Sequence, residues 1–144
     1  MAIQLQLRKG TKVQNDAFTG AEGELTYDTD SKGLRVHDGQ TSGGHMIDTV
    51  VAWQAPTAEN NYTWYRKYSS GWVEQGGYTS MTDTVMTIDL PVTMSNTSYT
   101  LLIFQEKTGD GQNVPGITNK TASSFSINAS GTANGGWQVS GMTA

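Results

Sequence analysis

The stretch ELTYDTDSKGLRVHDG, residues 24–39, indicates how the chain folds. Two short runs of strand-forming residues, Glu24 to Tyr27 and Leu34 to His37, flank a polar segment that ends in Gly33. Asp, Ser and Gly favour tight turns, and glycine accepts the positive φ that many such turns require. We therefore predict a β-hairpin, followed by a second tight turn at Asp38-Gly39.

The residues before this hairpin predict another strand with one buried face. Ile3, Leu5 and Leu7 alternate with polar side chains, which is the period of a half-buried strand. The segment up to residue 47 carries only a handful of apolar side chains, and domains below about 40 residues usually need metals, disulfides or oligomerisation. We expect residues 1–47 to form a small β module whose apolar face is covered from outside.

Residues 48–144 differ in composition from residues 1–47. Their strand-forming segments are longer and richer in aromatic residues, and most are separated by Gly, Asn, Ser, Asp or Pro. Several strands of four to eight residues with turn signals between them predict an antiparallel β-sandwich. The candidate strands are residues 49–54, 62–68, 71–75, 85–90, 98–105, 123–128 and 136–139.

Two of these runs indicate which faces are buried. Met86, Ile88 and Leu90 alternate with more polar neighbours, so we expect these three side chains to face the core. The run YTLLIF, residues 99–104, is apolar on both faces. It predicts a central strand covered on both sides, one of them by a neighbouring subunit.

Composition excludes several classes of protein. The chain has 144 residues, of which 35% are hydrophobic and 15% charged, and no cysteine, so it has neither a disulfide framework nor a Cys-ligated zinc site. A net charge of -4 argues against nucleic acid, which requires clustered Lys and Arg. No apolar run is long enough to cross a bilayer and the first residues do not resemble a secretory signal. We expect synthesis in a cytoplasm and no membrane insertion.

Metal binding is a minor alternative. His37 and His45 each stand near an aspartate, and imidazoles of three copies could gather around one ion on a symmetry axis. Asp28 and Asp30 have the spacing of a calcium loop, but the position of its bidentate glutamate is taken by Gln40, so the segment is interpreted as a turn. We predict no metal and no cofactor.

Catalysis is not predicted either. Carboxylates that could pair for glycoside hydrolysis are present, but sequence spacing along strands does not place them together. A nucleophile elbow, a phosphate loop and a His-Glu-x-x-His motif are all missing from the sequence. The carboxylates considered are Glu74, Asp83, Asp89, Glu106 and Asp110.

The N-terminal segment resembles a module that begins many phage tail-fibre, head-fibre and tropism-determinant proteins. Four blocks in the same order carry the resemblance: LQLRKGT (5–11), AFTGAEGEL (17–25), DTD (28–30) and LRVHDG (34–39). The resemblance to the phage major tropism determinant N-terminal domain implies a small intertwined β module at the particle-attached, trimerising end of such proteins. Three copies would complete the core that one copy lacks.

The second segment is similar to C-terminal β domains of phage tail proteins. The similarity lies in WYRKYSSGWVEQGG (64–77), IDLPV (88–92) and YTL (99–101). The chain has no repeated shaft between the two modules, which favours a short projection over a long fibre.

The sequence thus predicts an all-β, homotrimeric, non-enzymatic bacteriophage virion protein, a short fibre or a tail or head projection made in the host cytoplasm. Its module 1–47 would attach to other tail or capsid proteins, and its domain 48–144 would bind a host-surface glycan or protein. The alternative is a capsid head fibre or decoration protein with no dedicated receptor binding.

Candidate site residues follow from exposed aromatics and a predicted tip loop. Receptor contact is predicted for Tyr78, Asp110, Gln112 and Asn113. The trimer interface is predicted at Ile3, Leu5, Leu7, Trp64 and Trp72, and Trp137 is assigned to the core or the same interface.

Overall fold

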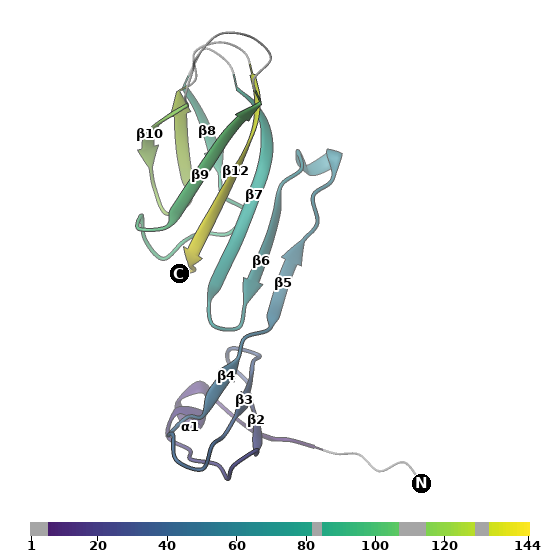
Figure 1. Cartoon of the computed structure of the whole chain (residues 1–144), viewed down its shortest axis with the longest axis vertical. Helices are drawn as coiled ribbons and strands as arrows, with labels where there is room; N and C mark the ends of the chain where they lie inside the picture. Colours follow the sequence, from purple (N-terminus) through teal and green to yellow (C-terminus); the bar gives the residue numbers. More distant parts are fainter. Residues whose placement is uncertain (1–5, 82–84, 107–114, 129–132) are drawn as a thin grey trace. The chain divides into compact units, whose positions relative to one another are not determined.

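The computed structural model describes residues 6–81, 85–106, 115–128 and 133–144, and it consists mostly of β-strands (Figure 1). The chain divides into two compact units. The first comprises residues 1–51 with 68–70, and the second comprises residues 52–67 with 71–144. A mostly β fold with antiparallel sheets is confirmed, whereas the homotrimer and the domain boundary after residue 47 stay predictions. Within the described ranges, no helix is long and apolar enough to cross a membrane.

The first unit holds a four-stranded sheet with the order β1-β2-β3-β4. β1 pairs with β2 in parallel, and the other two pairs are antiparallel. The elements are β1 (Arg8–Gly10), α1 (Lys12–Asp16), β2 (Leu25–Asp28), β3 (Leu34–Val36) and β4 (His45–Ile47).

The first predicted strand is only partly testable. Ile3 and Leu5 lie outside the described residues. Leu7 does not belong to a strand, contrary to our expectation, because pairing with β2 starts at Arg8, opposite Thr26. Leu7 is 37% exposed, so its side chain remains accessible for contact with another copy.

The hairpin between β2 and β3 is confirmed. The Asp28 N–H donates to the Gly33 carbonyl at 2.9 Å, and Asp28 Oδ1 accepts from the backbone N–H groups of Asp30 and Ser31 at 3.0 and 3.1 Å. These bonds belong to an aspartate-capped turn. The bonds agree with our interpretation of this segment as a turn.

The role we expected for Gly33 is wrong. The positive φ of this turn lies at Lys32, with φ 60°, and not at the glycine. Gly33 is required for a different reason: a Cβ there would lie 3.0 Å from both Cβ and Oγ of Ser69. Close packing against residue 69 is a long-range effect that a local turn pattern does not reveal.

Helix α1 was not anticipated. Thr11 Oγ1 accepts from the Gln14 N–H at 3.3 Å and Gln14 Oε1 accepts from the Thr11 N–H at 2.9 Å, which is a capping box. Buried Asn15 donates to the carbonyls of Gly10 and Thr11. A helix of five residues held by polar bonds shows no apolar periodicity, so the pattern search misses it.

Two further sheets contain the remaining strands (Figure 1). The five-stranded sheet has the order β5-β6-β7-β12-β9 and the three-stranded sheet has the order β10-β11-β8. The registers of β6–β7, β7–β12, β12–β9, β10–β11 and β11–β8 are antiparallel. Two strands, β4 and β10, were not predicted. The strands are β5 (Val50–Gln54), β6 (Trp64–Tyr68), β7 (Trp72–Met81), β8 (Val85–Asp89), β9 (Thr100–Glu106), β10 (Gly116–Lys120), β11 (Ser124–Asn128) and β12 (Ala133–Met142).

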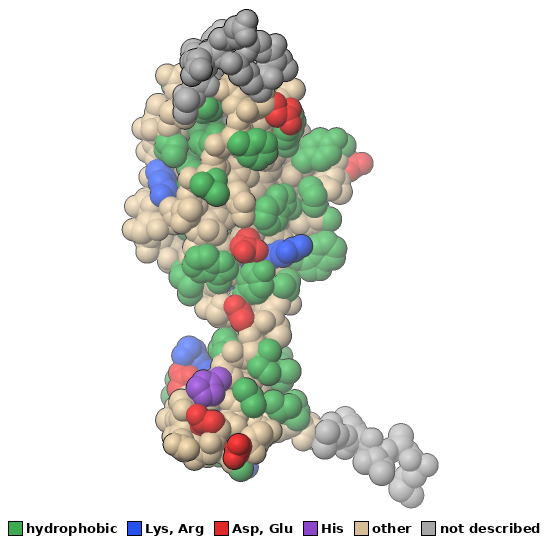
Figure 2. Space-filling model, in the orientation of Figure 1, with side chains coloured by type: hydrophobic (Ala, Val, Ile, Leu, Met, Phe, Trp, Pro, Cys, Tyr) green, Lys and Arg blue, Asp and Glu red, His purple; other side chains and the backbone are tan. Residues whose placement is uncertain are grey.

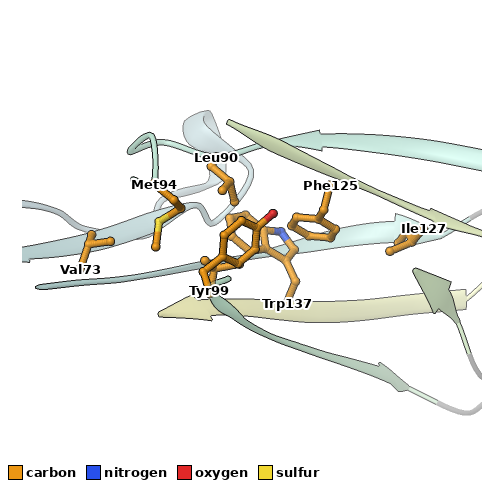
Figure 3. Close-up of a cluster of buried hydrophobic side chains, with 8 residues drawn as sticks. Val73, Leu90, Met94, Tyr99, Phe125, Ile127 and Trp137 are labelled. Carbon is orange, nitrogen blue, oxygen red and sulfur yellow. The ribbon is translucent and has the colours of Figure 1, made fainter. Parts of the chain in front are cut away.

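Register assigns each side chain of the large sheet to one face. In β6, β7, β12 and β9, odd-numbered residues pair with odd and even with even, so odd residues share one face and even residues share the other. Val73 and Val139 on the odd face are fully buried. Trp137, also on the odd face, packs edge-on against Phe125 of β11 with ring centroids 5.5 Å apart (Figure 3). Both sheets therefore contribute to one core, as a sandwich requires.

The predicted alternation in residues 85–90 is confirmed. Leu90 is buried and Met86 and Ile88 pack against the core, whereas Val85 is 58% exposed. The interpretation of residues 99–104 as a central strand is wrong, because β9 lies at the end of its sheet and pairs with β12. An apolar run identifies buried faces but not hydrogen-bonding neighbours, which is why edge and centre are indistinguishable in the sequence.

The tryptophans divide between the two faces. Trp137 is 5% exposed and belongs to the core. Trp64 and Trp72 lie on the even face, where Trp64 is half-buried and Trp72 is 40% exposed. The even face therefore carries the two tryptophans that we predicted for a subunit interface.

Candidate functional site

The first unit is organised around a buried guanidinium. Arg35 of β3 is 5% exposed, and its Nη2 lies 2.8 Å from Asp28 Oδ2 while its Nη1 lies 2.8 Å from Asp16 Oδ1. Nη1 also donates to the Gly43 carbonyl at 3.1 Å. Arg35 thereby ties together α1, the end of β2 and the turn before β4.

Asp28 is the fully buried partner of this cation. Burial alone would raise the pKa of Asp28, but hydrogen bonds from Arg35 and from the backbone of Ser31 and Asp30 outweigh it and lower the pKa below its usual value. The carboxylate is therefore ionised at neutral pH. The pair is structural, because its oxygen atoms are committed to groups of the same chain.

The interior of this unit is polar. The described residues 6–51 include no fully buried hydrophobic side chain. Those that are buried are instead Asn15, Thr26, Asp28, Arg35 and His37. Polar networks hold an interior in register but supply little of the hydrophobic stabilisation that a folded unit requires.

His37 is committed within its own chain. Its Nδ1 accepts from the Gly20 N–H at 3.1 Å, so Nε2 carries the proton and donates to Thr26 Oγ1, also at 3.1 Å. The ring is 2% exposed and contacts Phe18 edge-on. An axial cluster of His37 side chains from three copies is incompatible with this arrangement.

His45 is the first residue of β4, and its side chain is exposed. Its Nε2 lies 3.1 Å from Asp38 Oδ2, and bonds from the Thr41 hydroxyl and the Thr41 and Gln40 N–H groups hold the pKa of Asp38 well below its usual range. Gly39 has φ 78°, so the tight turn predicted at Asp38-Gly39 is confirmed. No group of three His, Asp or Glu side chains able to hold a metal occurs in the part of the chain that is described.

The even face of the five-stranded sheet carries an apolar surface, which we call the outward sheet face. Leu102 is 60% exposed and Phe104 58% exposed, and Met142 and Trp72 are paired in register at 47% and 40% exposure. Trp64 completes the group from β6. Figure 2 shows hydrophobic side chains spread over this region of β6, β7, β12 and β9. The outward sheet face is defined here as Trp64, Trp72, Leu102, Phe104 and Met142.

Glycines flatten this surface. A Cβ at Gly76 would lie 2.8 Å from Trp64 Nε1, and a Cβ at Gly136 would overlap the Phe104 ring. Each aromatic ring therefore lies across the bare backbone of the neighbouring strand, where any other residue would displace it. The sheet face is therefore flat and apolar where Trp64 lies over Gly76 and where Phe104 lies over Gly136.

Polar groups also lie on the even face of the five-stranded sheet. The Tyr78 hydroxyl donates to Glu106 Oε2 at 2.5 Å, and its ring contacts Tyr62 edge-on at 6.4 Å between centroids. Its hydrogen bond to the Glu106 carboxylate raises the pKa of Tyr78. Arg66 stands opposite Glu74 in the register of β6 and β7. Arg66 and Glu74 therefore bring opposite charges side by side on this face, between the Trp72–Met142 pair and the Trp64–Gly76 pair.

A small hollow of about 210 Å³ lies at one end of the same face. Its walls combine Trp72, Tyr99 and Met142 with serine, threonine and asparagine residues of β9, β12 and the segment before β9. Ligand pockets usually measure about 300–1,000 Å³. The hollow suits a single side chain or one sugar ring better than a larger ligand.

The predicted site residues are only partly placed. Asp110, Gln112 and Asn113, like Ile3 and Leu5, lie outside the described residues. Tyr78 is half-buried beside the outward sheet face, and its receptor contact stays a prediction. Trp64 and Trp72 are brought together on one face, although the interface itself stays a prediction.

Sequence reasoning missed the buried Arg35 and the exposure of Leu102 and Phe104. For Arg35 the local pattern points the other way, because a charged residue between Leu34 and Val36 in a strand is expected on the solvent-facing side. Once buried, the guanidinium requires buried or hydrogen-bonding partners. Nothing in the sequence indicates that the partners would be Asp16 and Asp28.

The N-terminal segment is similar to known proteins. Residues 5–41 match the family described as "Major tropism determinant N-terminal domain". The chain is 50% identical over 47 residues to the "Tail fiber receptor-binding protein" of Bordetella phage BPP-1, a stretch that covers 33% of this chain and 12% of that protein. A solved structure of the "Major Tropism Determinant U1 Variant" is 35% identical to this chain. The superposition covers 44% of this chain and 20% of that protein, with a TM-score of 0.31.

The whole fold has a counterpart as well. An R2 pyocin fibre of P. aeruginosa superimposes on 97% of this chain and 37% of its own, with a TM-score of 0.54 and 13% identity. At this identity the likeness is one of fold. The chain spans well under half of each of these proteins. The 47-residue match and the family match together show that residues 5–41 of this chain are similar to the major tropism determinant N-terminal domain, and neither match extends over the rest of the chain.

Proposed function

We propose that this chain is a structural component of a bacteriophage particle that acts in attachment to the host. In this proposal the family domain at residues 5–41 joins the chain to other virion proteins, and the β domain presents a surface to the host cell. The observation that carries it is the 50% identity over 47 residues to a tail-fibre receptor-binding protein. The proposed role is binding without catalysis.

The polar interior of the first unit supports a homotrimer. A unit whose described residues bury no hydrophobic side chain needs additional apolar contacts, and further copies of the same chain supply them in a closed symmetric assembly. Half-exposed Leu7, next to β1, is placed to take part. Together with Ile3 and Leu5 it forms the apolar N-terminal group to which we assign trimer contacts.

Host contact is assigned to Tyr78 and to the segment with Asp110, Gln112 and Asn113. Polar side chains together with an aromatic side chain suit contact with a glycan or protein surface. Single weak sites become effective when three are held together, because the second and third bind at high effective concentration.

The test combines location and binding. Antibodies against the chain should label the tail of intact virions in electron micrographs, and the purified protein should bind susceptible bacteria saturably while leaving a resistant strain unlabelled. Labelling of the capsid with no cell binding would instead support the decoration-protein alternative. Virions that lack the chain altogether would refute the proposal, and release of reducing sugar from host polysaccharide would refute its non-enzymatic part.

A further inference from the structure

We infer that the hollow at the end of the outward sheet face binds one neutral sugar ring, a pyranose of a host-surface glycan. The inference rests on the proposed function, because it names a ligand class for host attachment, but it puts this contact at a site separate from Tyr78. It also gives Trp72 a ligand contact in place of the subunit contact predicted from the sequence.

The hollow lies where β12 ends and β7 begins (Figure 1). Trp72 stands opposite Met142 in the register of β7 and β12, and Thr100 stands opposite Ser140 in the register of β9 and β12. All four are even-numbered, so their side chains project from the same face of the sheet. An apolar pair therefore lies beside a pair of hydroxyl groups.

This combination matches the two kinds of surface that a pyranose presents. One face of the ring consists of C–H groups, for which the apolar surface of Trp72, 40% exposed, and Met142, 47% exposed, is available. The rim of the ring carries hydroxyls, which both donate and accept hydrogen bonds, as do the hydroxyls of Thr100 and Ser140. Neither of these two hydroxyls is hydrogen-bonded to another residue in the described ranges of the chain. Stacking and hydrogen bonding are thus offered at one place.

The charge of the lining selects a neutral sugar. None of the described residues that line the hollow is Asp, Glu, Lys, Arg or His. Glu74 stands opposite Ser140 and Arg66 stands opposite Glu74, but neither side chain belongs to the lining. Phosphates, carboxylates and ammonium groups are recognised most strongly by an ionised partner. The hollow offers no such partner, so it suits a neutral pyranose better than an acidic or amino sugar.

The rim of the hollow is fixed by bonds within the chain. The Ser95 N–H donates to the Met142 carbonyl at 2.8 Å, and the Ser98 N–H donates to Asn96 Oδ1 at 2.7 Å. Tyr99, which follows this segment, is 5% exposed and belongs to the hydrophobic core. A site that is ordered before its ligand arrives loses less conformational freedom on binding. The segment before β9 is therefore a preorganised wall.

The volume limits the ligand to one ring. The hollow measures about 210 Å³, which is the volume of roughly seven water molecules in the liquid at about 30 Å³ each. One pyranose ring needs a space of this order, and two rings need more. A ligand of that size binds weakly, with a dissociation constant in the millimolar range. Weak binding is sufficient on a particle that carries several copies, because bound copies hold the others near the surface.

The experiment is saturation-transfer NMR on the full chain. The probes are the methyl pyranosides of glucose, galactose, mannose, rhamnose and N-acetylglucosamine, and we expect transfer to the ring protons of at least one. Trp72→Ala removes the stacking surface, and Thr100→Val removes a hydroxyl while keeping the shape of the side chain. Each should raise the dissociation constant at least fivefold. The matched control is Trp53→Ala, which removes a tryptophan that is 68% exposed in β5 and outside the lining, and it should bind like the wild type.

The result for Thr100→Val decides the inference if Trp72→Ala fails to fold. Absence of transfer to all five probes would overturn the inference, and so would binding that Thr100→Val leaves unchanged or that Trp53→Ala weakens equally. Tighter binding of methyl glucuronide or glucosamine than of every neutral probe would overturn the assignment to a neutral sugar. Binding to susceptible bacteria is measured separately. Saturable cell binding by a chain that binds none of the sugars would refute this site and leave the proposed function standing.

Discussion

Replacing Arg35 with methionine tests the buried ion pair of the first unit. Methionine retains much of the side-chain length but leaves the Asp28 carboxylate, 0% exposed, without its cation. Removing one partner of a buried pair costs about 3–5 kcal/mol, because the other charge stays buried and uncompensated. Two backbone N–H donors, those of Asp30 and Ser31, still stabilise Asp28, so we expect the lower end, about 3 kcal/mol.

The loss should depend on pH in a defined direction. In the wild type the pKa of Asp28 is lowered, so the stabilisation is complete above the unfolded pKa of about 3.9 and disappears as pH falls through the folded pKa. Without Arg35, burial of Asp28 is less well opposed and its pKa rises. The stability difference between variant and wild type should therefore shrink as the pH is lowered from 7 toward 4.

Hydrogen exchange reads out this unit separately. All four tryptophans, at positions 53, 64, 72 and 137, belong to the second unit, so tryptophan fluorescence reports the unfolding of that unit. The rate of amide hydrogen exchange in peptides from β2 and β3 reports the stability of the first unit. A loss of about 3 kcal/mol accelerates exchange by about two powers of ten. The control Lys12→Met removes only the exposed pair with Asp16 and should change exchange less than threefold. An Arg35→Met variant that exchanges no faster than this control would refute the reasoning.

Two further substitutions test other contacts. Gln75→Glu should destabilise the second unit by about 2 kcal/mol at pH 7, measured by urea unfolding, because buried Gln75 donates to the Val92 carbonyl and accepts from its N–H. The introduced buried carboxylate has a raised pKa, so the deficit should diminish toward acid pH, and a pH-independent deficit would contradict this cause. Gly33→Ala should cost about 1–2 kcal/mol through contact with Ser69, whereas Gly116→Ala, with nothing within 4 Å, should be neutral or slightly stabilising; equal melting temperatures for the two would count against the packing argument.

Local signals in the sequence were sufficient for some parts of the fold. The β2–β3 hairpin follows from the turn residues around Asp28, and the burial of Leu90 follows from alternation. Contacts between segments that lie far apart in the chain could not be predicted from the sequence. Which carboxylates meet Arg35, and whether the strand with Leu102 lies at the centre or the edge of its sheet, depend on segments far away in the chain. The hydrophobicity of a residue indicates that its side chain tends to be buried, but it does not indicate which surface buries it.

The two units leave apolar burial incomplete in opposite ways. In the first, polar groups such as Asp28, Arg35 and His37 fill the interior, so specificity is high while hydrophobic stabilisation is low. In the second, one copy closes a hydrophobic core around Phe125 and Trp137, and a further apolar face remains beyond it. The second unit thus has the hydrophobic core that a domain needs to fold, whereas the polar-centred unit has little apolar burial of its own. The homotrimer proposed above would supply the apolar contacts that the first unit lacks, so disrupting that assembly should destabilise the first unit more than the second.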